Sequence, residues 1–214
     1  MKQMVLVRHG ENDFGRRRLA GRLPGIELNS TGQAQAKRVL DWLEAWTINA
    51  VYSSPMERAV QTAEPLSQQR ALPIQISQGL NEIDYGAFQG KTYRQLQRIR
   101  LWKLLATQPL AVHFPGGEDF HQARARAVDA IEQILFNLPD NGTAVCFSHS
   151  DIIRLLITHF LSMPLETFQR LEITQGSLSV VMVSENGIRV PHINLVPLPL
   201  KTAPAPVSRV ERSK

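Results

Sequence analysis

The sequence predicts an α/β domain in which helices cover a mostly parallel sheet. Short apolar segments alternate with longer amphipathic ones along most of the 214 residues, and an Asn-Gly turn separates two apolar runs near the C-terminus. The alternation is typical of repeated strand-helix-strand units. The Asn-Gly turn indicates an antiparallel hairpin at an edge of the sheet, because it supplies the positive φ angles that a tight turn requires.

The expected elements follow from these patterns in chain order. Apolar runs predict strands at residues 3–7, 50–53, 72–77 and 143–147, followed by hairpin strands at 178–184 and 188–195. Helical spacing of apolar residues predicts helices at 29–46, 56–68, 93–107, 118–137 and 152–161. Capping residues at 29–31 and Pro55 suit the starts of the first two helices.

Length and composition favour one domain over residues 1–200, with a helical insertion at about 91–137. The lone Cys146 lies in an apolar run, so we expect a buried, unreactive thiol. The tail at 201–214 carries prolines and a net charge of +3, from four basic residues and one acidic one, and we expect it to be poorly ordered.

Charge and hydropathy argue against nucleic-acid and membrane partners. The net charge is +5, so only +2 remains once the tail is set aside, and the tail has no aromatic residues for stacking on bases. No apolar run approaches the ~18 residues that cross a bilayer, and no leader-like segment opens the chain. We therefore expect a cytoplasmic protein.

Phosphate-handling residues follow three of the predicted strands. Arg8, His9 and Gly10 follow the first strand, the segment 53–58 that ends in Arg58 follows the second, and Ser148, His149 and Ser150 follow the strand at 143–147. Ligands of parallel sheets bind beyond the carboxyl ends of the strands, so we expect these segments to meet. Two arginines would then surround two histidines.

This grouping suits transfer of a phosphoryl group to nitrogen. A neutral imidazole is not repelled by a dianionic phosphate monoester, so His9 is the candidate nucleophile. Arginine forks bind the non-bridging oxygens in pairs, as we expect of Arg8 and Arg58. Gly10 would let the backbone approach the phosphate, and His149 would donate to its oxygens as charge develops on them. The other histidines, His113, His121, His159 and His192, have no metal-ligand spacing, so neither a metal nor another cofactor is expected.

Four segments of the chain resemble the signature segments of the histidine phosphatase, or phosphoglycerate mutase-like, superfamily. They are LVRHGE at 6–11, SSPMERAVQTA at 53–63, LNEIDYGAFQG at 80–90 and FSH at 147–149. The resemblance implies a three-layer α/β/α sandwich with a phosphorylated histidine at His9. It also implies a phosphate pocket made by Arg8, Arg58 and His149, with Glu82 as the proton donor.

Several site assignments stay open at this point. Asp84 lies two residues from Glu82 and rivals it as proton donor, and only the family pattern favours Glu82. Gly15 stands where many members have an asparagine, and Asn12 or Arg16 could supply the missing contact. The expected substrate-binding residues are Arg8, Gly10, Asn12, Arg22, Arg58, His149 and Ser150.

Two loop segments have both a functional and a structural interpretation. The basic cluster of Arg16, Arg17, Arg18 and Arg22 is either a rim that attracts anions or a solvated loop. Glu118, after Pro115 and two glycines, resembles a substrate-side residue of phosphatases in this family. Its alternative role is to start the helix that follows, where an acidic residue complements the helix dipole.

The segment after Glu82 lacks the Arg-His-Tyr and the long insertion typical of mutases. We therefore predict a metal-independent phosphoric monoester hydrolase of the phosphatase branch, acting on a small phosphorylated metabolite. A phosphoglycerate mutase-type phosphotransferase is the first alternative. A non-catalytic phosphate- or phosphoprotein-binding module is the second, although binding alone needs neither a nucleophile nor a proton donor. The outer strand of the final hairpin also offers an edge for pairing in a homodimer.

Overall fold

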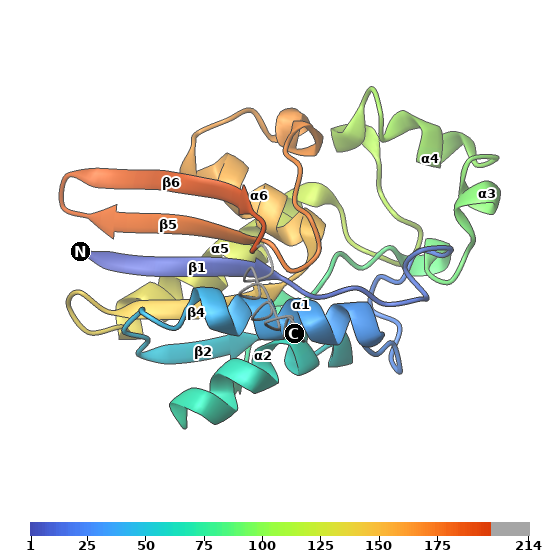
Figure 1. Cartoon of the computed structure of the whole chain (residues 1–214). Helices are drawn as coiled ribbons and strands as arrows, with labels where there is room; N and C mark the ends of the chain where they lie inside the picture. Colours follow the sequence, from blue (N-terminus) through green and yellow to red (C-terminus); the bar gives the residue numbers. More distant parts are fainter. Residues whose placement is uncertain (198–214) are drawn as a thin grey trace, which may run out of the picture.

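The computed structural model describes residues 1–197, and the predicted tail at 201–214 lies outside them. Six strands form one sheet in the order β3-β2-β4-β1-β5-β6. The parallel strands are β1 (Lys2–Arg8), β2 (Ala50–Ser53), β3 (Ile74–Ile76) and β4 (Thr143–Ser148). The antiparallel hairpin consists of β5 (Leu178–Ser184) and β6 (Gly187–Leu195) at one edge (Figure 1). The predicted fold class is confirmed.

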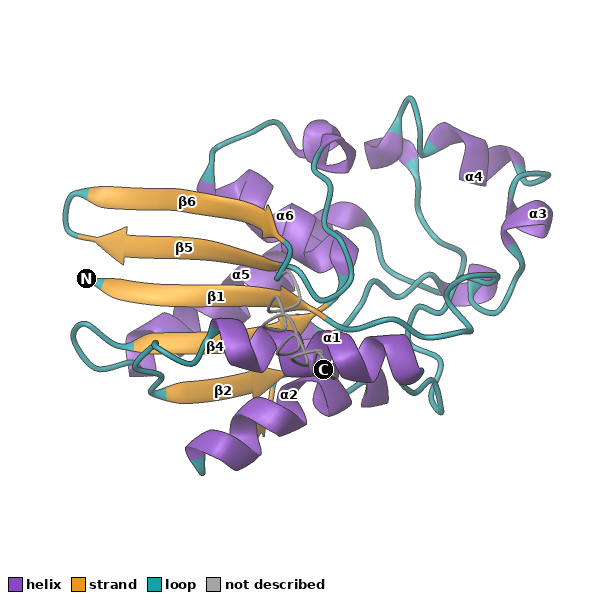
Figure 2. Cartoon of the chain, viewed as in Figure 1, coloured by secondary structure: helices purple, strands orange, loops and turns teal. Residues whose placement is uncertain are grey.

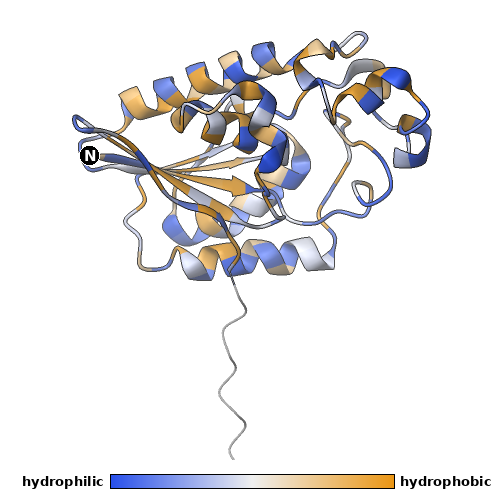
Figure 3. Cartoon of the chain, turned by 90° about the horizontal axis from the view of Figure 1, so that it is seen from above, coloured by the Kyte–Doolittle hydropathy of each residue, from blue (hydrophilic) through white to orange (hydrophobic). Residues whose placement is uncertain are grey.

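Helices cover both faces of this sheet (Figure 2). On one face, α1 (Ser30–Trp42) and α2 (Glu57–Arg70) pack on alternate residues of β1, Val5 and Val7. On the other face, α5 (Phe120–Asn137) and α6 (Ser150–Phe160) pack on Met4 and Leu6. Successive strand residues point to opposite faces, so a strand buried on both sides is apolar throughout. Figure 3 shows the mostly hydrophobic strands between the two helical layers.

The parallel strands end at the same level, and this alignment positions the site. In the register of the sheet, Arg8 lies opposite Ser148, and Ser53 lies opposite Phe147. The main chain stays paired one residue further, since His9 N–H donates to Ser148 and Ser54 N–H donates to Phe147. The three predicted phosphate-handling segments therefore start from one edge of the sheet.

The predicted helix at 93–107 is wrong as a single element. It is two short helices, α3 (Tyr93–Leu96) and α4 (Arg100–Leu104), separated by Ile99 in an extended conformation. The apolar spacing that predicts one helix instead serves tertiary contacts: Leu96 is fully buried and the Trp102 ring packs edge-on against Phe88. Both helices lie beyond the carboxyl ends of the strands, apart from the two main layers (Figure 1).

Other helix boundaries move by a few residues. α5 starts at Phe120 and not at 118, because Asp119 caps it in a capping box with Gln122. α1 ends four residues earlier than predicted, and α6 starts two residues earlier, directly after His149. Short 3₁₀ helices occupy Gln78–Leu80, Gly86–Phe88, Pro109–Ala111 and Leu165–Arg170. Within residues 1–197, no helix is both long enough and apolar enough to cross a membrane.

Candidate active site

His9 lies directly after β1 and is almost completely buried. Its Nδ1 is 2.7 Å from the carbonyl oxygen of Gly10, so Nδ1 carries the proton and donates it. The other ring nitrogen, Nε2, is therefore unprotonated and acts as an acceptor. The Nε–H of Arg58 points at this nitrogen from 3.3 Å. The ring is thus held in the tautomer that a nitrogen nucleophile requires.

Arg58 comes from the first turn of α2 and is fully buried. Its Nη2 donates to the carbonyl of Gly21 at 2.7 Å and lies 3.2 Å from Nδ1 of His149. The guanidinium therefore lies between the two histidines, whose ring centroids are 5.1 Å apart. Three segments far apart in the sequence meet at this side chain.

Two guanidinium nitrogens at this position are buried without a hydrogen-bond partner among the described residues: Nε of Arg8 and Nη1 of Arg58. Arg8 uses its Nη1 to donate to the carbonyl of Ile173 at 2.6 Å, which fixes its head. Buried donors are rarely unpaired, since desolvation costs about 1–3 kcal/mol for each. A bound anion between Arg8, Arg58 and His9 would satisfy them.

The cationic surroundings keep both histidines neutral. Burial, followed by the charges of Arg58 and Arg8, lowers the pKa of His9 well below its usual value. Burial and the charge of Arg58 also lower the pKa of His149 strongly. A neutral imidazole at position 9 is the form that can attack phosphorus.

His149, the N-cap of α6, uses both ring nitrogens within the protein. Its Nε2 donates to Oγ of Ser54 at 2.7 Å, and its Nδ1 accepts from Arg58. We expected this ring to donate to phosphoryl oxygens, whereas here it orients the arginine. Direct donation to a phosphoryl group stays a prediction.

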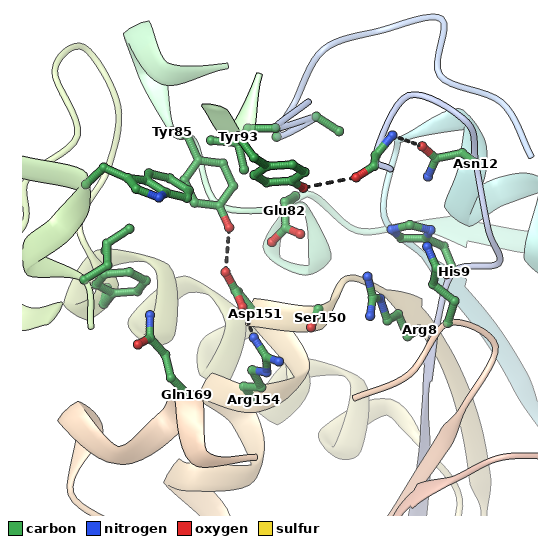
Figure 4. Close-up of a pocket in the computed structure, with 18 of the residues that line it drawn as sticks. Arg8, His9, Asn12, Glu82, Tyr85, Tyr93, Ser150, Asp151, Arg154 and Gln169 are labelled. Atoms are coloured by element: carbon green, nitrogen blue, oxygen red, sulfur yellow. Dashed lines mark hydrogen bonds and ion pairs between the residues drawn. The ribbon is translucent and has the colours of Figure 1, made fainter. Parts of the chain in front are cut away.

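Glu82 and Asp84 lie in different environments, although they are only two residues apart. Glu82 is 9% exposed and lines the cavity, and its Oε2 is 4.0 Å from Nδ1 of His149. Burial, and next the charge of Asp151, raise the pKa of Glu82 to about 7. Asp84 is half-exposed and accepts from its own turn, from Gly86 N–H at 2.9 Å. Of these two carboxyl groups, Glu82 lines the cavity (Figure 4) and Asp84 does not, and the role of proton donor stays a prediction.

The loop after His9 gives a mixed result. Asn12 is buried and lines the cavity together with Gly15, whose N–H it accepts at 2.6 Å. Arg16 instead pairs with Glu11 at 2.5 Å on the surface.

A Cβ on Gly10 would lie 2.6 Å from the carbonyl oxygen of Gly32. Close packing against α1 is therefore sufficient to require glycine at position 10, and the expected approach of this backbone to phosphate stays a prediction.

Arg22, which we expected in the substrate pocket, faces away from it. Its Nε donates to the carbonyl of Glu82 at 2.7 Å, and its Nη2 donates to Glu118 at 2.8 Å. The head is engaged with protein acceptors and does not line the cavity, so this geometry gives a substrate contact no support and the contact stays a prediction. Arg18 is also used within the protein, where it donates to Gly90.

A cavity of about 800 Å³ extends from Arg8, His9 and Arg58 toward α3 and α4. Much of its wall consists of residues that the sequence motifs do not indicate. The Tyr85 hydroxyl donates to Asp151 at 2.6 Å, Arg154 donates to the other oxygen of Asp151 at 2.8 Å, and Tyr93 closes one side (Figure 4). Asp151 directly follows the predicted Ser150, which does line the cavity, so helix spacing could have signalled Arg154 one turn later.

The described residues contain no group of three or more histidine, cysteine or acidic side chains placed to hold a metal ion. His113 pairs with Asp119 at the surface. Cys146 is buried in β4, and burial raises the pKa of its thiol to about 12, which makes it unreactive.

Comparison with known proteins agrees with this geometry. The family model described as histidine phosphatase superfamily (branch 1) matches residues 4–196. The chain therefore belongs to this superfamily, and the resemblance found in its motifs is confirmed.

Individual relatives include both phosphatases and mutase-like proteins. Phosphoserine phosphatase 1 of Hydrogenobacter thermophilus is 26% identical over 203 residues, which is 91% of this chain and 93% of that protein. Phosphoglycerate mutase-like protein 4 of Arabidopsis thaliana is 31% identical over 160 residues, covering 72% of this chain and 69% of that protein. The structure of Bacillus stearothermophilus YhfR superposes with a TM-score of 0.85 at 25% identity, covering 92% and 98% of the two chains.

Proposed function

We propose that this protein is a phosphoric monoester hydrolase that removes phosphate from a small metabolite through a phosphohistidine on His9. The observation that carries the proposal is the unprotonated Nε2 of His9, which accepts from Arg58, beside buried, unpartnered nitrogens of Arg8 and Arg58. This combination provides a nucleophile and an anion-binding site next to each other.

In the first half-reaction, the Nε2 lone pair forms a bond to phosphorus while the bond to the ester oxygen breaks. Charge develops on the phosphoryl oxygens, where Arg8 and Arg58 stabilise it. The proton of Glu82 moves to the leaving oxygen, so an alcohol departs and a carboxylate remains. In the second half-reaction, Glu82 takes a proton from a water molecule whose oxygen attacks phosphorus, and the bond to Nε2 breaks.

The cavity supports a metabolite-sized substrate. Its volume of about 800 Å³ far exceeds what a phosphate group fills, and aromatic and amide side chains line the end remote from His9. The phosphoserine phosphatase relative acts, by its name, on a substrate of this kind.

A screen of phosphate monoesters without added metal tests the proposal. The native protein should release phosphate, and rapid quenching should trap a single phosphoryl group on His9, located by mass spectrometry. His9→Ala should lose both signals, whereas His121→Ala, an exposed histidine on α5, should keep them. Equal turnover by the native protein and His9→Ala would contradict the proposed function. Transfer of the trapped group to a phosphoglycerate in preference to water would identify a mutase, and binding without turnover would identify a non-catalytic module.

A further inference from the structure

Glu118 lies just before α5, outside the cavity wall, and is the centre of a dense hydrogen-bond network. Its Oε1 accepts from Nη2 of Arg22 at 2.8 Å and from Nη2 of Arg126 at 2.6 Å. Its Oε2 accepts from Nε of Arg126 at 2.9 Å. The carboxylate therefore holds two arginines that come from separate parts of the chain, the loop after β1 and helix α5.

Both arginines also donate to a single acceptor, the main-chain carbonyl of Glu82. Nε of Arg22 is 2.7 Å from this oxygen, and Nη2 of Arg126 is 3.0 Å from it. Arg126 also donates to the carbonyl of Gly79 at 2.8 Å. The backbone that carries the proton donor is thus fixed from two sides by groups that Glu118 holds in place.

Gly117 and Glu118 pack directly against the segment that follows Glu82. Asp84 N–H donates to Oε1 of Glu118 at 3.0 Å, and Glu118 N–H donates back to the carbonyl of Asp84 at 2.9 Å. A Cβ on Gly117 would lie 2.1 Å from the carbonyl oxygen of Asp84. The two segments can approach this closely only because position 117 has no side chain.

We propose that Glu118 is a positioning residue that keeps the Glu82 carboxyl at the leaving oxygen by holding Arg22 and Arg126 on the Glu82 main-chain carbonyl. The inference rests on the proposed function, since it concerns the proton donor of that reaction. Glu118 does not touch the cavity; it acts through the backbone. Displacement of a reacting group by about 1 Å costs on the order of 10²-fold in rate, so an indirect contact of this kind has a measurable effect.

The charge of Glu118 suits this role. Although burial opposes ionisation, hydrogen bonds and charge from Arg126, together with Asp84 N–H and the charge of Arg22, lower the pKa of Glu118. The carboxylate stays ionised and offsets two guanidinium charges that would otherwise face each other across the Glu82 carbonyl.

The test uses Glu118→Gln and two substrates that differ in their need for a proton donor. An alkyl phosphate leaves as a basic alkoxide and requires protonation, whereas p-nitrophenyl phosphate leaves as a stabilised phenolate. For the alkyl phosphate, we expect kcat/KM to fall about tenfold or more. For p-nitrophenyl phosphate, we expect a change of about twofold or less, and the inhibition constant of inorganic phosphate should also stay within about twofold.

Glu132→Gln, the same loss of charge at an exposed position of α5, is the matched control and should behave as the native protein does. If Glu118→Gln does not fold, the same measurements are made on Arg22→Gln. That change removes one hydrogen bond to the Glu82 main-chain carbonyl and leaves the Arg126–Glu118 pair intact. Equal losses with both substrates, or no loss with either, would overturn the inference. Failure of the native protein to form a phosphohistidine would instead contradict the proposed function.

Discussion

At the scale of single residues, the carboxyl groups of Glu82 and Asp84 differ in burial and therefore in their ability to carry a proton. Glu82 is buried in the cavity wall and its pKa is raised to about 7, mainly by desolvation. Asp84, two residues away, caps a turn and lies within 3.8 Å of Arg22. A carboxyl that is half-protonated near neutrality can both donate and recover a proton, which suits the two half-reactions of a phosphohistidine enzyme.

A pair of matched substitutions tests this assignment. Glu82→Gln should lower kcat/KM for an alkyl phosphate by about 10²–10⁴-fold, the usual contribution of a positioned acid. Asp84→Asn should leave it within a few-fold of the native value, because Asp84 faces the loop and not the cavity. The measurement is steady-state kinetics on both variants. A larger loss in Asp84→Asn would reverse the assignment.

The pH dependence of the native protein provides a second test. Glu82 must be protonated to donate, so kcat/KM for an alkyl phosphate should decline as the pH rises above about 7. Asp151 favours the protonated form, whereas Arg58 and Arg8 oppose it, and burial decides the direction. This decline should be absent in Glu82→Gln. A decline that persists unchanged in the variant would point to another group.

At the scale of elements, the central strand β4 determines where the site residues lie. β4 is buried along its whole length and pairs with β1 on one side and β2 on the other. It therefore sets the level at which both neighbours end. Phe147 on this strand is fully buried among residues of the α1/α2 face, whereas Phe136 on α5 is 86% exposed.

These two phenylalanines give a matched stability experiment. Phe147→Ala should lower the free energy of unfolding by about 3–5 kcal/mol, because it leaves a cavity in the core. Phe136→Ala should change it by about 0.5 kcal/mol or less, as is usual for exposed positions. Urea denaturation followed by circular dichroism measures both. A loss in Phe136→Ala as large as that in Phe147→Ala would show that α5 is packed differently.

At the scale of the whole molecule, the site makes stability depend on pH. His9 and His149 have a pKa far below 6.5 in the folded state, so at lower pH only the unfolded chain protonates them. Glu82 acts in the opposite sense, because its pKa is about 7 in the folded state and 4.5 for an ordinary exposed glutamic acid. Between these limits the unfolded chain binds two protons, on His9 and His149. The folded chain binds one proton, on Glu82. Stability should therefore decrease as the pH falls.

The expected slope follows from this difference of one proton. Below about pH 6.5, the free energy of unfolding should fall as the pH falls, with a slope that approaches roughly 1.4 kcal/mol per pH unit. His149→Asn removes one of the two unfolded-state protons, so the slope in this window should fall to near zero even if the variant is less stable overall. Urea midpoints at several pH values give the slope. An unchanged slope in the variant would mean that the buried ring is not held neutral.

The fold and the phosphate end of the site follow from the sequence alone. Apolar runs buried on both faces identify the strands, and the polar residues after 8, 53 and 148 must meet because parallel strands end on one side. The division of the helix predicted at 93–107 and the orientation of Arg22 do not follow from the sequence.

Only the tertiary structure shows the environments of Glu82, Asp84, Arg22 and Glu118. They lie in or beside loops, where no regular period relates sequence position to side-chain direction, and their partners are up to 96 residues away in the chain. In strands and helices, the regular repeat of the backbone fixes the direction in which each side chain points. Burial and long-range hydrogen bonds, which set the pKa of Glu82 and the contacts of Glu118, exist only once distant segments have packed.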